Sequence, residues 1–60
     1  MDKEALLLLK RNCLVKATNE EYEEAYFEAV NLGYADEAYG GWSMNPSALI
    51  AFVDGYLTAK

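Results

Sequence analysis

Carboxylates are the side chains of this sequence best suited to chemistry, and five of them fall between residues 19 and 32. Glu20, Glu24 and Glu28 recur at every fourth residue, so a helix would place them on one side. Carboxylates arranged in this way bind metal in di-iron helix bundles, but those sites also use histidine, and the chain has none. A calcium-binding loop, with alternating acids around a glycine, is also missing from the sequence. We therefore expect no metal site.

The single cysteine, Cys13, is the other candidate for reactivity. A nucleophilic thiol needs a neighbouring base, and no histidine is available to provide one. Cys13 lies instead on the most apolar stripe of the first expected helix, together with Leu6 and Leu9. The Gly40-Gly41 pair matches neither the phosphate-binding nor the dinucleotide-binding pattern. The sequence thus predicts a buried, unreactive cysteine, no cofactor and no enzymatic activity.

Recognition of another molecule is the function that remains for the carboxylates. We define the acidic face as five residues on the polar side of the helix expected over residues 19–32: Glu20, Glu23, Glu24, Phe27 and Glu28. No lysine or arginine within that helix offsets these charges. An aromatic residue surrounded by polar groups is typical of an interface hot spot, and rows of carboxylates can imitate nucleic-acid phosphates. This pattern predicts a non-enzymatic inhibitor or decoy that docks on the basic, nucleic-acid-binding surface of a partner protein.

Three aromatic residues in the expected connector extend this prediction. Tyr34, Tyr39 and Trp42 fall outside the strongly periodic segments, and tyrosine and tryptophan are enriched at protein interfaces. We include them among the candidate partner-binding residues. The alternative is that they close a small core.

In size and charge, although not in any motif, the chain resembles small phage-encoded antagonists of host defence such as anti-CRISPR and anti-restriction proteins. That resemblance implies a protein that acts by binding a component of the host.

The acidic face also has two structural interpretations. It can be a solvated surface that keeps a small protein soluble. It can also lie beside the basic groups of the first helix and pair with them; these are Lys3, Lys10, Arg11 and Lys16. Phe27 has an alternative of its own, because the segment after Gly33 would bury it by folding back over it.

The charge is unevenly distributed along the 60 residues, which we expect to form one complete small domain. The formal net charge is −5, with two acids and four bases in residues 1–16 and eight acids but only Lys60 as a base in residues 17–60. An acidic protein is repelled by nucleic-acid phosphates and anionic membranes, so we expect neither as a direct partner.

The opposite charges of the two parts, and apolar rows on several sides of the first helix, favour a second function: a structural or assembly protein that self-associates.

Features of a secreted or membrane protein are not evident in the sequence. The Leu6-Leu7-Leu8-Leu9 run is too short for a signal peptide and ends at Lys10-Arg11. No stretch approaches the ~20 apolar residues of a membrane span. A lone cysteine fits a reducing compartment, so we expect a cytoplasmic protein.

Three helices are expected to position these residues in a small all-α domain. The periodicity predicts helices over about residues 2–17, 19–32 and 46–59, joined by a connector over 33–45 that contains a short helical turn from Tyr34 to Tyr39. Thr18 and Asn45 are the expected N-caps of the second and third helices. The alternative is an α+β fold with a C-terminal hairpin, because Asp54-Gly55 between apolar residues is also a turn signal.

Overall fold

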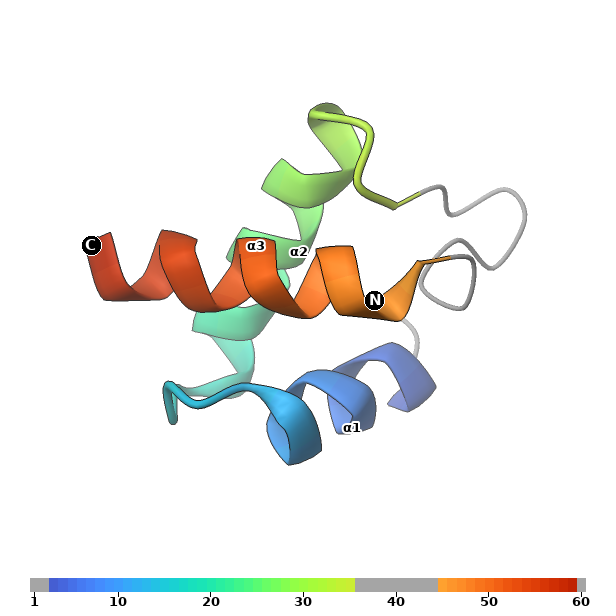
Figure 1. Cartoon of the computed structure of the whole chain (residues 1–60). Coiled ribbons are helices and arrows are strands. Elements are labelled where there is room, and N and C mark those ends of the chain that lie inside the picture. The colour runs from blue at the N-terminus through green and yellow to red at the C-terminus, as the bar shows by residue number, and fades with distance from the viewer. Residues whose placement is uncertain (1–2, 36–44, 60) are drawn as a thin grey trace.

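Three helices make up the regular structure of the described part of the chain. The computed structural model describes residues 3–35 and 45–59, and its helices are α1 (Lys3–Asn12), α2 (Asn19–Asn31) and α3 (Pro46–Ala59) (Figure 1). The predicted all-α class is confirmed. The alternative hairpin is wrong, because Asp54 and Gly55 lie in the middle of α3, where the apolar residues follow the helical period.

The start of α2 is fixed by the predicted capping box. The Glu21 backbone N–H donates to Thr18 Oγ1 (3.2 Å), and the Thr18 N–H donates to Glu21 Oε1 (2.9 Å). Each bond satisfies a backbone donor that the helical ladder leaves open.

The end of α2 is equally well defined. Gly33 has a positive φ of 86°, and the Tyr34 N–H donates to the Ala29 carbonyl (2.8 Å). Together with the bond from the Gly33 N–H to the Val30 carbonyl (3.1 Å), this is a Schellman motif, which favours glycine at the left-handed position. Helix α2 therefore has sharply defined ends.

Asn45 caps α3 as predicted. Its side-chain oxygen accepts from the Ala48 N–H (3.2 Å), and its carbonyl accepts from the Leu49 N–H (3.2 Å). Pro46 occupies the first helical position, where its missing N–H is no loss.

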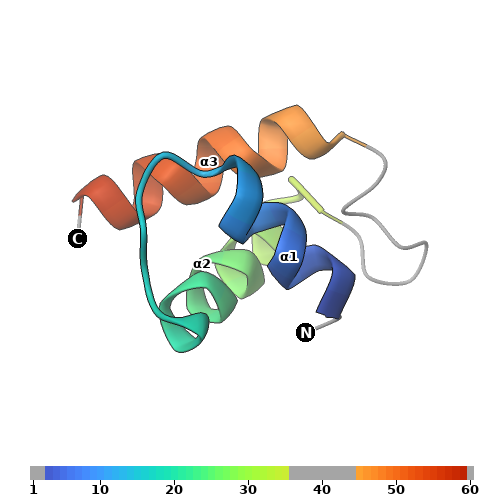
Figure 2. The same ribbon diagram turned by 90° about the horizontal axis from the view of Figure 1, so that it is seen from below.

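The core lies where the three helices meet. Helix α3 crosses α2, and α1 packs against both (Figures 1 and 2). The buried side chains are small or aliphatic, apart from two tyrosines of α2. The buried residues are Ala5, Leu9, Cys13, Tyr22, Ala25, Tyr26, Ala29, Ala35, Leu49, Val53 and Leu57. None of the helices formed by the described residues has the length and apolar character needed to cross a bilayer.

Helix α1 is shorter than predicted, because it ends at Asn12 and not near Ala17. The Asp54 carboxylate of α3 accepts the backbone N–H groups of Leu14 (3.1 Å) and Val15 (3.0 Å). These donors thus bond to α3 in place of carbonyls within α1, and the chain leaves the helical path.

The segment after α1 is also held by α2. The Tyr22 hydroxyl donates to the Val15 carbonyl (2.8 Å) and accepts from the Ala17 N–H (3.3 Å). Figure 2 shows this segment passing beside α3 before it reaches α2. The prediction of a helix through residue 17 failed because partners distant in the sequence satisfy this backbone.

The expected helical turn from Tyr34 to Tyr39 falls largely on residues 36–44, which lie outside the described residues. Tyr34 and Ala35 themselves are not helical, since α2 ends at Asn31 and is followed by its glycine cap.

We expect the Asp54→Asn substitution to lower the free energy of unfolding by about 1.5–3 kcal/mol, because hydrogen bonds to charged groups contribute on this scale. The amide keeps one acceptor oxygen and turns an NH₂ group toward the second backbone donor. Urea unfolding followed by circular dichroism measures the change. Glu23→Gln is the matched control, since it neutralises an exposed carboxylate of α2 and is expected to shift stability by less than about 0.5 kcal/mol. Equal effects of the two substitutions would contradict this role of Asp54.

The buried Cys13 thiol makes stability depend on pH in the alkaline range. Burial, together with the charge and hydrogen bond of Asp54, raises the pKa of Cys13 from 9.0 to about 11, against a lowering effect of Lys16. The unfolded chain releases the thiol proton at lower pH than the folded chain does. The stability that the protonated Cys13 thiol contributes to the folded state is therefore complete below about pH 9. It is lost as the pH rises toward about 11.

The corresponding measurement compares wild type with Cys13→Ala across this pH range. Other titrating groups act on both proteins, so the difference in their free energies of unfolding isolates the thiol. We expect wild type to lose stability relative to the variant as pH rises. A difference independent of pH would rule out the raised pKa.

Candidate functional site

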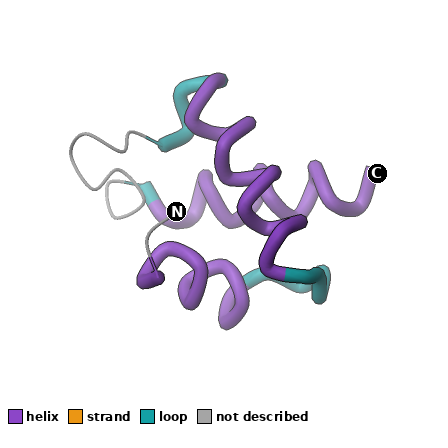
Figure 3. The backbone as a smooth tube through the Cα atoms, turned by 180° about the vertical axis from the view of Figure 1, so that it is seen from behind, coloured by secondary structure: helices purple, strands orange, loops and turns teal. Residues whose placement is uncertain are grey.

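The acidic face lies on the side of α2 opposite its buried residues, and one edge of it, at Glu24, reaches α3. In the view from behind, α2 is nearest to the viewer and the other two helices lie beyond it (Figure 3). Its buried residues, Tyr22, Ala25, Tyr26 and Ala29, recur at helical spacing and turn toward the core. That orientation leaves Glu20, Glu23, Glu24 and Phe27 exposed, with Glu28 half-buried at the flank.

The carboxylates of this face have different environments. Glu24 Oε1 accepts a hydrogen bond from the Tyr56 hydroxyl of α3 (3.1 Å). Within the part of the chain that the structure describes, the side chains of Glu20 and Glu23 make no hydrogen bond or ion pair. These two carboxylates therefore project into solvent, while Glu24 is tied to the neighbouring helix.

Lys16, one of the bases expected to neutralise this face, is used elsewhere. Its ammonium group donates to the carbonyl oxygens of Lys10 (3.1 Å) and Cys13 (3.3 Å) at the C-terminal end of α1. Cations at this end of a helix interact favourably with its open carbonyls and its dipole. Lys10 and Arg11 are exposed side chains of α1.

Phe27 is partly covered by its own helix. Its ring lies edge-on to the Tyr26 ring, with centroids 6.0 Å apart, and 43% of the residue stays exposed. The chain after Gly33 turns toward α3, where the Tyr34 ring stacks on Phe52. The first residues after the glycine cap thus do not supply the cover for Phe27 that the alternative required.

Tyr34 belongs to a row of three aromatic rings across α3. Tyr34 stacks on Phe52 (5.0 Å between centroids), and Phe52 stacks on Tyr56 (6.0 Å). The row leads to Glu24 through the Tyr56 hydroxyl. The sequence did not predict this link between the aromatic and acidic residues, although the i,i+4 spacing of Phe52 and Tyr56 indicates that these two rings are neighbours on α3. Tyr39 and Trp42, the other predicted aromatic site residues, lie outside the described residues.

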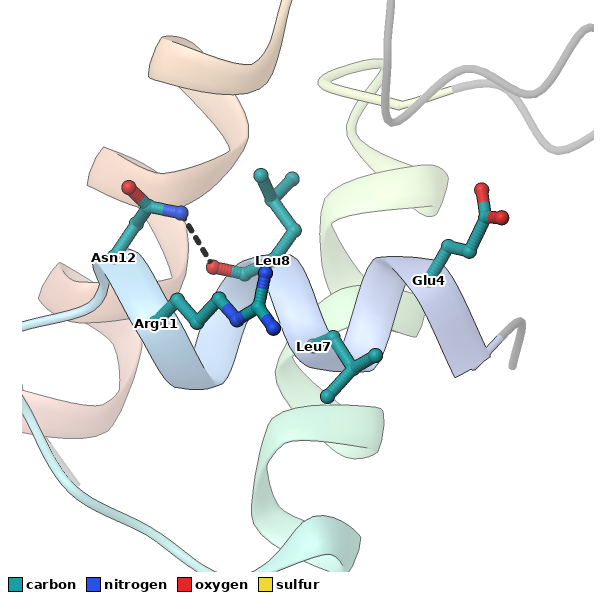
Figure 4. Close-up of a pocket in the computed structure, with 5 residues that line it drawn as sticks. All are labelled: Glu4, Leu7, Leu8, Arg11 and Asn12. Atoms are coloured by element: carbon teal, nitrogen blue, oxygen red, sulfur yellow. Dashed lines mark hydrogen bonds between the residues drawn. The ribbon is translucent and has the colours of Figure 1, made fainter.

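A second surface feature lies on α1, where a shallow open hollow runs along one flank of the helix. Figure 4 shows its lining side chains: Glu4, Leu7, Leu8, Arg11 and Asn12. The Asn12 side-chain amide donates to the Leu8 carbonyl (2.8 Å) and so closes the end of the helix. Leu7 is 48% exposed, as are Leu14 (88%) and Leu32 (59%) elsewhere among the described residues.

Cys13 occupies the position that the sequence predicted for it. The residue is buried, and its sulfur lies 4.0 Å from the Ile50 carbonyl oxygen of α3. A protonated, buried thiol is a poor nucleophile. Its surroundings thus make it a packing residue.

Phe27 is exposed enough for a test of binding that leaves the fold intact. We expect Phe27→Ala to lower the free energy of unfolding by about 1 kcal/mol, well below the 3–5 kcal/mol typical of a buried phenylalanine. Leu49→Ala, at a fully buried position of α3, is the comparison and is expected to cost about 2–5 kcal/mol. Thermal and urea unfolding of both variants measure the two effects. A loss at Phe27 as large as that at Leu49 would show that the ring is part of the core.

Comparison with known proteins identifies no relative of this chain. The chain matches no protein-family model, and no curated protein or solved structure is significantly similar to it.

Proposed function

We propose that this protein is a non-enzymatic interaction module that binds a basic surface of another protein through the acidic face of α2. The observation that carries the proposal is the exposure of Phe27 on the same side of α2 as Glu23, one turn before it, and Glu20, two turns before it. These two carboxylates have no partners among the described residues. A role in solubility would account for the charges of this face, but it would not account for a half-exposed aromatic ring among them.

The capped ends of α2 support this proposal. Both ends of the helix are capped, so the backbone that carries the exposed groups is already ordered before binding. A backbone that is ordered in advance loses little conformational entropy on association. Phe27 would enter a pocket of the partner, while Glu20 and Glu23 would meet arginine or lysine side chains around it.

A nucleic-acid-binding surface is the kind of basic surface that this geometry fits best. Glu20, Glu24 and Glu28 are each four residues apart, about 6 Å along the helix axis, and form a row of negative charge. Such a row can occupy a cationic groove in place of phosphates and thereby inhibit the partner. The net charge of −5 disfavours direct binding of this protein to nucleic acid.

The test is a pull-down from the native host with wild type and with Glu23→Lys/Phe27→Ala. Glu24 is left unchanged because it bonds to Tyr56. The control is Ala51→Lys/Thr58→Lys, which makes the same change of two charge units at exposed positions of α3. We expect a basic partner to be retained by wild type and the control and lost by the acidic-face variant.

The purified partner then allows a quantitative check. The partner is expected to bind the acidic-face variant at least about tenfold more weakly than wild type. Binding of wild type should also weaken as the salt concentration is raised, because exposed charges are screened. Nucleic acid should compete for the same surface. Equal affinity for the variant and wild type would overturn the proposal.

A further inference from the structure

The hollow on α1 has a charge pattern that is complementary to itself. Along the helix, Glu4 lies one turn to one side of the Leu7-Leu8 pair and Arg11 lies one turn to the other side (Figure 4). At ~100° per residue, these four residues fall within an arc of about 100°, so they belong to one side of α1. An acid and a base thus stand at equal distances from an apolar centre.

We infer that this side of α1 pairs with a second copy of the chain in an antiparallel, two-fold arrangement. A two-fold axis between positions 7 and 8 brings Leu7 of one copy against Leu8 of the other. The same axis sets Glu4 of each copy beside Arg11 of the other. A parallel pairing would instead place like charges together, so the pattern selects the antiparallel one.

The apolar centre gives the two copies a reason to associate. Leu7 is 48% exposed, whereas Leu8 is half-buried because it packs partly against the core. Contact between copies therefore removes mainly Leu7 surface from water. The hollow between these side chains can receive the leucine of the other helix as a ridge enters a groove. Lys3 and Lys10, the remaining cations of α1, do not line the hollow and do not face each other across it.

The small size of the chain adds to this argument. A domain of 60 residues buries a smaller share of its surface than a larger one, and self-association is a common source of further burial. One short helix covers a small area, so the dimer is a weak one with a Kd on the order of 10–100 µM. The hollow on α1 is separate from the acidic face on α2, so a dimer presents two acidic faces.

Sedimentation equilibrium of the full chain, from about 10 µM to about 1 mM, tests this pairing. We expect wild type to move from monomer to dimer across this range. Leu7→Lys should weaken dimerisation by at least about tenfold. Leu32→Lys is the matched control, because it makes the same change at another exposed leucine and should leave the dimer unaffected. A wild type that stays monomeric throughout, or equal effects of the two variants, would overturn the inference.

A charge exchange tests the antiparallel geometry itself. Glu4→Arg and Arg11→Glu are each expected to weaken self-association by about tenfold, because each sets two like-charged contacts across the axis. An equimolar mixture of the two variants restores opposite charges at both contacts and should associate at least as tightly as wild type. Circular dichroism verifies that both variants keep their helices. A mixture that associates no better than its separate components would rule out this pairing.

Discussion

The hydrogen bonding of the Asp54 carboxylate is the interaction on which the rest of the arrangement depends. From the middle of α3, it accepts the backbone N–H groups of Leu14 and Val15, and the Tyr22 hydroxyl of α2 bonds to the same segment. The short connection after α1 is thus attached to both other helices. A segment of this kind has few backbone partners of its own, so these side chains fix where α1 ends and how it lies on the core.

The position of α1 has consequences for both surfaces of the molecule. Ending the helix at Asn12 turns Cys13 into the core and directs Lys16 onto the open carbonyls of α1. That base therefore stabilises a helix end. The flank of α1 that carries Leu7 faces away from the core, because Ala5 and Leu9 are the residues that α1 buries.

The two surfaces that we propose for recognition differ in how they are built. The acidic face lies on a helix whose ends are both capped, and its link to α3 runs through the bond from Tyr56 to Glu24. The hollow on α1 is lined by a single helix and combines leucines with one acid and one base. The first suits a strongly cationic partner, and the second suits a copy of itself.

The sequence by itself determined the features that depend on neighbours along the chain. The capping box at Thr18, the glycine cap at Gly33 and the cap at Asn45 set the ends of α2 and the start of α3, because their partners lie within five residues. Helical periodicity likewise predicted which side of α2 carries its exposed glutamates. Only the tertiary structure decided where α1 ends, which ring Tyr34 stacks on and which carboxylate Tyr56 binds. These contacts join residues from 18 to 40 positions apart, and local propensity carries no information about partners at such distances.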